Sequence, residues 1–147
     1  MARERQLATF FLNKLFFGVE VEKVQEVIRY QELTRVPLAP TVVRGLINLR
    51  GQIVTAIDLR SRLELAPRRD DQLPMNVVVR TDDGAVSLLV DEIGDVLEIA
   101  EDTFESPPET IRGEARELIR GVHKLKDQLL LVLDVEAVLH AKGRKAA

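Results

Sequence analysis

The chain has 147 residues, of which 46% are apolar and 31% are charged, and it contains no cysteine. This composition is typical of a globular domain, and the missing cysteine excludes disulfides, thiolate catalysis and cysteine-ligated metal sites. A formal net charge of −3 argues against a nucleic-acid-binding protein. The longest apolar run, residues 129–133, is too short to cross a membrane, and no signal-peptide pattern is present, so we expect a cytoplasmic protein.

A β-hairpin is the first element that the pattern predicts. Residues 9–12 and 16–21 form its strands, and residues 13–15 form its turn. Alternation along the strands points Phe11 and Phe16 outward. The residues expected to point inward are Phe10, Leu12, Phe17, Val19 and Val21.

The next segments are expected to alternate between short helices and a second hairpin. Helix-like spacing of Val24, Val27 and Ile28 predicts a helical turn. A loop is expected to enter a short helix near Pro40. Residues 46–49 and 52–57 then form a hairpin around Arg50-Gly51, and Asp58 is expected to cap a short helix.

The second half of the chain follows a polar, proline-bearing segment at residues 66–72, which predicts a loop. Asp82-Asp83-Gly84 separates two apolar runs and predicts a hairpin turn, because Asp and Gly tolerate positive φ. Near the end, Asp134 is expected to cap another short helix.

Two parts of the chain repeat. Residues 44–59 align without gaps with residues 120–135, and residues 18–27 align with residues 87–96. We therefore expect one domain over residues 7–140, built from a unit at 7–65 and a second at 73–140. Residues 1–6 and the basic residues 141–147 are expected to be tails. Short strands with regular turns indicate two small barrels with a groove between them.

Motifs for catalysis are missing from the sequence. His123 lies in a strand-like segment and His140 near the end of the chain, and both are expected to be ordinary surface or edge residues. None of the three serines lies in a nucleophile elbow, and neither common phosphate-binding loop occurs. We therefore expect no enzyme activity, no cofactor and no metal.

Residues 43–54, with the sequence VRGLINLRGQIV, are followed by Ile57-Asp58-Leu59-Arg60. This combination resembles the signature of the CheW family of chemotaxis coupling proteins, and ordered matches extend over about residues 7–140. The resemblance implies a mainly β fold of two five-stranded SH3-like β-barrels with short helices. It also implies a non-catalytic adaptor that links chemoreceptor tips (methyl-accepting chemotaxis proteins) to the regulatory domain of the histidine kinase CheA. Self-association in rings is a further expectation.

The same resemblance implies receptor contacts at Val24, Glu26, Gly45, Arg50 and Val96. The guanidinium fork of Arg50 suits a carboxylate or the carbonyls at a helix end. Each residue also has a plainer interpretation. Core packing explains the two valines, a special backbone conformation explains the glycine, and solvation explains the two charged residues.

A kinase-binding patch is the hypothesis for the first hairpin, where Leu15-Phe16 replaces the polar turn usual in the family. Phe11 and Phe16 form the patch, and Leu15 and Leu33 lie at its edge. In the alternative interpretation, the two phenylalanines only cover each other as a cross-strand pair.

A second kinase contact is expected at Pro108 and Ile111, in the loop of residues 106–113. Two alternative functions stay open at this point. One is an adaptor in pilus motility or another non-chemotaxis array. The other, from a different class, is a small-barrel nucleic-acid-binding protein, which the acidic composition and the 4% aromatic content disfavour.

Overall fold

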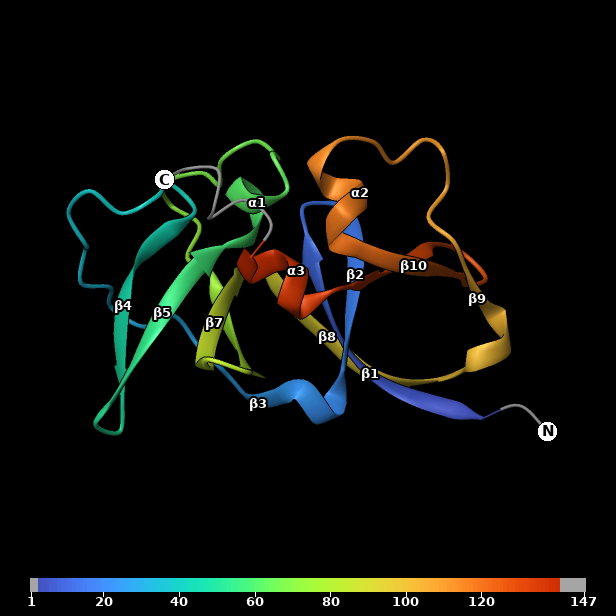
Figure 1. The fold of residues 1–147 in the computed structure, drawn as a ribbon, viewed down its shortest axis with the longest axis horizontal. Coiled ribbons are helices and arrows are strands. Elements are labelled where there is room, and N and C mark those ends of the chain that lie inside the picture. The colour runs from blue at the N-terminus through green and yellow to red at the C-terminus, as the bar shows by residue number, and fades with distance from the viewer. Residues whose placement is uncertain (1–2, 141–147) are drawn as a thin grey trace.

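The computed structural model describes residues 3–140 and consists of two curved β-sheets, with short helices gathered near their junction (Figure 1). The elements of the first half are β1 (Glu4–Leu12), β2 (Leu15–Glu20), η1 (Val21–Lys23), β3 (Val24–Ile28), β4 (Val43–Leu49), β5 (Gln52–Asp58) and α1 (Leu59–Arg62). Those of the second half are β6 (Met75–Thr81), β7 (Gly84–Val90), β8 (Glu92–Ala100), η2 (Glu101–Thr103), β9 (Phe104–Glu105), α2 (Glu114–Leu118), β10 (Ile119–Lys124), β11 (Leu129–Leu133) and α3 (Val135–His140). β1 begins within the expected N-terminal tail, and the expected tail at 141–147 lies outside the described residues.

Each sheet combines strands from both repeat units. The six-stranded sheet has the order β8-β1-β2-β11-β10-β9, and the five-stranded sheet has the order β3-β6-β7-β5-β4. The first unit therefore contributes its β1–β2 hairpin to the sheet of the second unit, which contributes β6–β7 in return. Parallel pairs join the exchanged strands, β2 to β11 and β5 to β7. The mainly β fold with short helices is confirmed. The sheets do not close into barrels, because the first and last strands of each sheet are not paired with each other.

The internal repeat extends to the details of strand pairing. Leu46 and its repeat equivalent Val122 each pair with a short segment at the edge of their sheet. A β-bulge precedes both Gly45 and its equivalent Gly121. The two units therefore share their irregularities as well as their strands.

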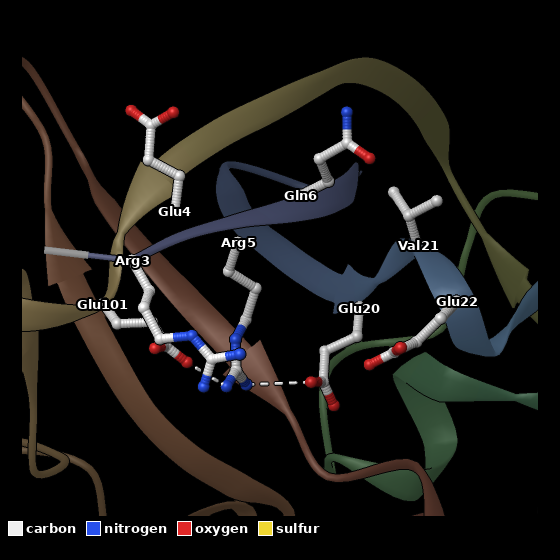
Figure 2. Close-up of a pocket in the computed structure, with 8 residues that line it drawn as sticks. All are labelled: Arg3, Glu4, Arg5, Gln6, Glu20, Val21, Glu22 and Glu101. Carbon is white, nitrogen blue, oxygen red and sulfur yellow. Dashed lines mark hydrogen bonds and ion pairs between the residues drawn. The ribbon is translucent and has the colours of Figure 1, made fainter.

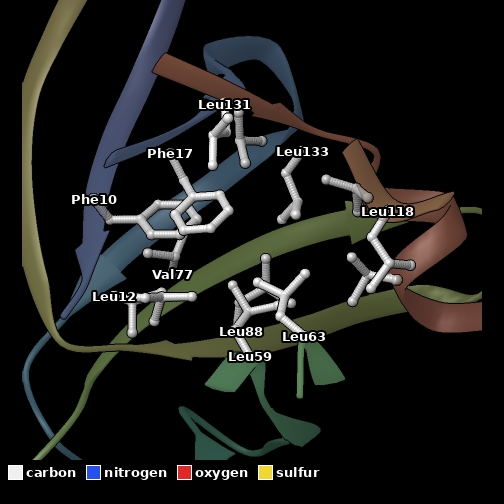
Figure 3. Packing of buried hydrophobic residues seen from close by; sticks show 14 of the residues in the cluster. Phe10, Leu12, Phe17, Leu59, Leu63, Val77, Leu88, Leu118, Leu131 and Leu133 are labelled. Carbon is white, nitrogen blue, oxygen red and sulfur yellow. The ribbon is translucent and has the colours of Figure 1, made fainter. Parts of the chain in front are cut away.

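The central core lies between the two sheets and contains the inward residues of the first hairpin (Figure 3). Phe10 and Phe17 stack with their ring centroids 5.7 Å apart, and Leu12 and Val19 are fully buried. Val21 lies past the end of β2 and is half-buried in η1. Each fully buried large apolar side chain stabilises the fold by roughly 1.5–3 kcal/mol.

The prediction that Phe16 points outward to solvent is wrong, because this residue is only 7% exposed. Phe16 does lie on the face opposite Phe17, but that face is covered by a second cluster that includes Leu7, Ile99 and Leu130. Phe11 is half-buried against the same cluster and stacks on Phe16 with ring centroids 4.8 Å apart. A curled sheet buries both of its faces, so alternation alone does not predict exposure.

Two segments that were expected to be helical are not. Val24, Val27 and Ile28 belong to β3, where backbone pairing with β6 suits β-branched side chains better than a helix. Residues 37–42 form turns instead of a helix starting near Pro40, and Leu38 has a positive φ of 66°.

The predicted turns and helix caps are confirmed. The hairpin turns lie at residues 50–51 and 82–83. An oxygen of Asp58 accepts a hydrogen bond from the Arg60 amide at 3.1 Å, and Asp134 does the same for the Ala137 amide at 3.1 Å. Both caps therefore satisfy backbone donors at the start of a helix, as the sequence pattern predicts.

Candidate functional site

Glu26 and Arg50 form an ion pair that links the two edges of the five-stranded sheet. Glu26 lies on β3, and Arg50 lies in the turn after β4, so the two residues come from the opposite edges of the sheet. Arg50 Nη2 donates a hydrogen bond to Glu26 Oε2. This bond lowers the pKa of Glu26 and raises the pKa of Arg50. The Arg50 side chain is 70% exposed, so its fork remains accessible to a partner.

The turn that carries Arg50 is held by its own backbone and by one side chain. Arg50 and Gly51 both have positive φ, as the tight turn between paired strands requires. The Asn48 side-chain oxygen accepts a hydrogen bond from the Gly51 amide at 2.9 Å. The Asn-Leu-Arg-Gly segment of the signature therefore presents Arg50 on a rigid hairpin tip.

The two valines expected at the receptor surface differ in exposure. Val24 is half-buried and packs against the central core, so the core-packing interpretation applies to it. Val96 lies on β8, an edge strand of the other sheet, and is 57% exposed. Only Val96 of the pair presents an apolar side chain to solvent.

Gly45 occupies a position where a side chain does not fit. Its φ is 156°, and a Cβ at this residue would lie 2.6 Å from the carbonyl oxygen of Thr34. The equivalent Gly121 would place a Cβ 2.5 Å from the Glu105 carbonyl oxygen. Both glycines therefore allow an edge segment to approach closely, and the backbone interpretation of Gly45 agrees with its geometry.

The candidate kinase contacts lie in three places. Leu15 is 41% exposed at the start of β2, whereas Phe11 and Phe16 pack into the second cluster. Leu33 is half-buried against a third cluster, inside the five-stranded sheet. Pro108 and Ile111 are half-buried in the loop before α2, and the Pro108 and Ile111 carbonyls accept hydrogen bonds from Arg116 at 2.7 and 3.0 Å.

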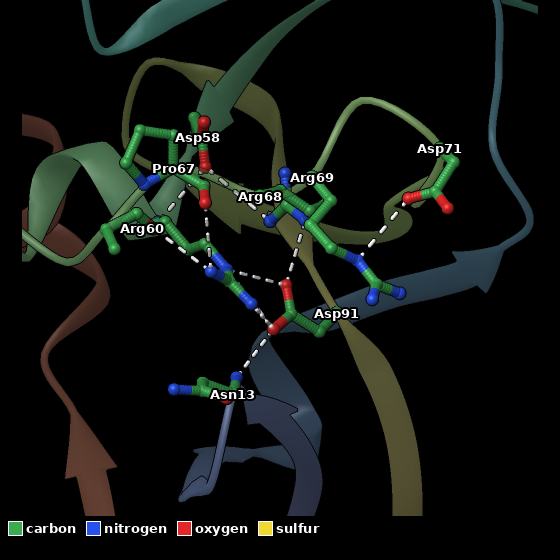
Figure 4. A network of polar contacts seen from close by, with 9 residues as sticks. Asn13, Asp58, Arg60, Pro67, Arg68, Arg69, Asp71 and Asp91 are labelled. Atoms are coloured by element: carbon green, nitrogen blue, oxygen red, sulfur yellow. Dashed lines mark hydrogen bonds and ion pairs between the residues drawn. The ribbon is translucent and has the colours of Figure 1, made fainter.

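Sequence reasoning missed a buried polar network centred on Asp91, between β7 and β8 (Figure 4). The carboxylate accepts hydrogen bonds from Arg60 Nε at 3.0 Å, from Arg68 Nε at 2.8 Å and from the Asn13 amide. Burial alone would raise the pKa of Asp91, but these hydrogen bonds together lower it. The network ties the first hairpin, α1 and the loop between the units to one carboxylate. The acidic pair Asp91-Glu92 was the visible signal, but its basic partners are distant in sequence.

The expected surface position of His123 is wrong, because the residue is only 3% exposed on β10, beside β9, where the Phe104 ring contacts it. Its Nδ1 lies 2.8 Å from the Thr103 hydroxyl, which itself donates to the Ala100 carbonyl. His123 is therefore the donor in this contact. Burial lowers the pKa of His123, and the charge of Arg5 lowers it further, so the ring is neutral at pH 7. The side chain of His140 lies outside the described residues.

A polar pocket of about 350 Å³ near the start of β1 is lined by arginine and glutamate side chains, some of which form ion pairs (Figure 2). Arg5 donates to Glu20 at 2.8 Å and also pairs with Glu101, while Arg120 donates to Glu20 at 3.1 Å. Among residues 3–140, no group of three or more His, Asp or Glu side chains is arranged to hold a metal ion. No helix within the same range is long and apolar enough to span a membrane.

Comparison with known proteins identifies the family. The model of the CheW-like domain matches residues 6–143. Chemotaxis protein CheW of Treponema pallidum is 30% identical over 141 residues, which are 93% of this chain and 83% of that protein. Protein PilI of Pseudomonas aeruginosa is 29% identical and covers 91% of this chain and 75% of its own length. The crystal structure of the scaffolding protein TtCheW from Thermoanaerobacter tengcongensis is 25% identical, with a TM-score of 0.86 and 96% of each chain covered. The chain therefore belongs to the CheW-like family.

Proposed function

We propose that the protein is a non-catalytic cytoplasmic adaptor that couples the tips of chemoreceptors to the regulatory domain of the histidine kinase CheA. The observation that carries the proposal is the meeting of Glu26 and Arg50 on the surface. The family resemblance assigns both residues to receptor contact, and the fold brings them together from opposite edges of one sheet.

On the receptor side, Arg50 is the residue that can exchange its ion-pair partner for a group of the receptor. Its exposed guanidinium can leave Glu26 for a carboxylate or for carbonyls at the end of a receptor helix. Glu26 is then available to a cation of the same partner. Such an exchange adds specificity and orientation, because both charges stay paired only with a complementary partner. Val96 contributes an apolar contact on the other sheet.

On the kinase side, Leu15 is the exposed member of the proposed patch, Phe11 adds a half-buried ring from the same hairpin, and Phe16 is buried in the second cluster. Leu33, Pro108 and Ile111 are proposed as further contacts. Since the two units are interlocked copies, they present related faces, which favours association in rings. The 29% identity to Protein PilI favours a second candidate, an adaptor of the same kind in a non-chemotaxis pathway.

Calorimetric titration with the CheA regulatory domain of the same organism tests the proposal. Saturable binding is expected, and Leu15→Ser is expected to weaken it by about tenfold through lost apolar burial. Ile53→Ser is the matched control, because Ile53 is 61% exposed on β5, in the sheet that does not contain the β1–β2 hairpin. Absence of binding at high concentration, or equal weakening by both variants, would contradict the kinase contact.

A further inference from the structure

The two repeat units differ at one end, where the second unit has a helix and the first has none. In the second unit, Ile111, Ala115 and Leu118 pack into the central core around α2 and α3, and Leu118 is fully buried. The Asp134 amide donates to the Leu118 carbonyl at 2.8 Å. In the first unit the Asp58 amide donates in the same way to Val42, also at 2.8 Å, so the two sites are structurally equivalent.

The first unit leaves this position open. At the repeat offset, the equivalents of Ile111 and Ala115 are Arg35 and Ala39, in the turn segment that precedes Val42. The positive φ of Leu38 and the prolines around it keep this segment from forming a helix. A hollow of about 640 Å³ results, which is within the range of ordinary binding pockets.

The walls of the hollow are about half apolar, and the charged side chains at its rim leave an excess of positive charge. The apolar lining comes mainly from Val36, Pro37, Ala39, Val43 and Leu65, and Ser61 of α1 stands where α3 has Ala137.

Among the described residues, no carboxylate pairs with Arg35, and Arg44 makes only a 3.9 Å contact with Asp58. Asp58 is only 5% exposed, and Arg68 also lies 3.6 Å from it. An anionic group is therefore the natural complement of the rim.

We propose that this hollow docks a short helical segment of a second protein, with an apolar face and at least one carboxylate, in the position that α2 occupies in the other unit. The hollow lies at the Val43 end of β4, and Arg50 lies beyond the opposite end of that strand. Seven strand residues separate the two sites by roughly 20 Å. A segment bound in the hollow therefore leaves the Glu26–Arg50 surface accessible. The proposal does not depend on the adaptor function.

A peptide derived from the chain itself is the probe. It is the capped peptide of residues 109–119 with Arg112→Gln and Arg116→Gln, which keeps the apolar residues of α2 and three glutamates. Titration into the isotope-labelled full chain is expected to shift the amide resonances of Ala39, Val43 and Ser61 in a saturable way. The same peptide with Leu118→Ser is expected to bind about tenfold more weakly.

Ala39→Trp fills the hollow and is expected to abolish these shifts while the spectrum stays folded, and Ser61→Arg serves if that variant does not fold. Shifts located elsewhere, no saturation at millimolar peptide, or equal binding of both peptides would overturn the proposal. Two other occupants would also overturn it. A concentration-dependent dimer that Ala39→Trp disrupts would identify a second copy, and peptide binding only after removal of residues 141–147 would identify the tail.

Discussion

Replacing Asp91 by asparagine removes the charge at the centre of the buried network and keeps the shape of the side chain. The Asp91 side chain is 3% exposed, and its partners Arg60 and Arg68 are 10% and 6% exposed. Two buried guanidinium groups would lose their shared carboxylate. Breaking a buried ion pair on one side costs about 3–5 kcal/mol. That is a large part of the roughly 5–15 kcal/mol that stabilises a domain.

Chemical denaturation followed by circular dichroism measures this loss, and thermal unfolding should show a fall in Tm on the order of 10 °C. Asp71→Asn is the matched control. Asp71 pairs with Arg69 at 3.4 Å, but both side chains are about 80% exposed (Figure 4). Loss of such a surface pair is expected to change the free energy of unfolding by about 0.5 kcal/mol or less.

The effect of Asp91→Asn should also depend on pH. The hydrogen bonds to Asp91 hold its pKa below the usual value in the folded protein. Its stabilisation is therefore complete above about pH 4, where an unfolded aspartate ionises, and is lost as the pH falls through the lower folded pKa. The difference in the free energy of unfolding between the wild-type protein and the variant should become smaller at acidic pH. Equal stability of the Asp91 and Asp71 variants, or a difference independent of pH, would refute this reasoning.

Three further changes test separate parts of the structure. Gly121→Ala is expected to lower the free energy of unfolding in denaturant by about 3 kcal/mol, because the new Cβ would lie 2.5 Å from the Glu105 carbonyl oxygen. Arg50→Glu is expected to weaken calorimetric binding of a receptor-tip fragment, and Glu26→Arg in the same chain to restore the ion pair and part of the binding. The pKa of His123 is lowered in the folded protein, so protonation of this residue favours the unfolded state. The free energy of unfolding should therefore fall as the pH decreases below about 6.5, and His123→Gln should flatten this dependence.

Each of these expectations has a contradicting outcome. Unchanged unfolding of Gly121→Ala would exclude the close approach of β9. Undiminished receptor binding by Arg50→Glu would exclude the hairpin tip from that contact. A wild-type pH dependence in His123→Gln would place the titrating group elsewhere.

Features that depend on neighbouring residues were predictable from the sequence. The turn at Arg50-Gly51, the caps at Asp58 and Asp134, and the inward-facing Phe10 all follow from local backbone chemistry and alternation. The repeat also identified the equivalent segments correctly. It did not show that the units exchange hairpins, because similarity between two copies does not say which copy each strand pairs with.

Features that depend on distant residues were not predictable in this way. Phe16 is buried by Ile99 and Leu130, which come from the other unit. His123 is buried beside β9, whose Phe104 ring contacts it, and Asp91 meets Arg60 and Arg68 only after the sheets have formed. At the candidate site, the family signature identified Glu26 and Arg50 separately, whereas their pairing across the sheet became visible only in the fold.

The adaptor claim is tested most directly by co-sedimentation. Receptor-containing membranes and the CheA regulatory domain from the same organism are centrifuged with increasing amounts of this protein. We expect the kinase domain to sediment with the membranes only when the protein is present, and less so with Arg50→Glu or Leu15→Ser. Kinase sedimentation that does not change with the amount of the protein would contradict the account.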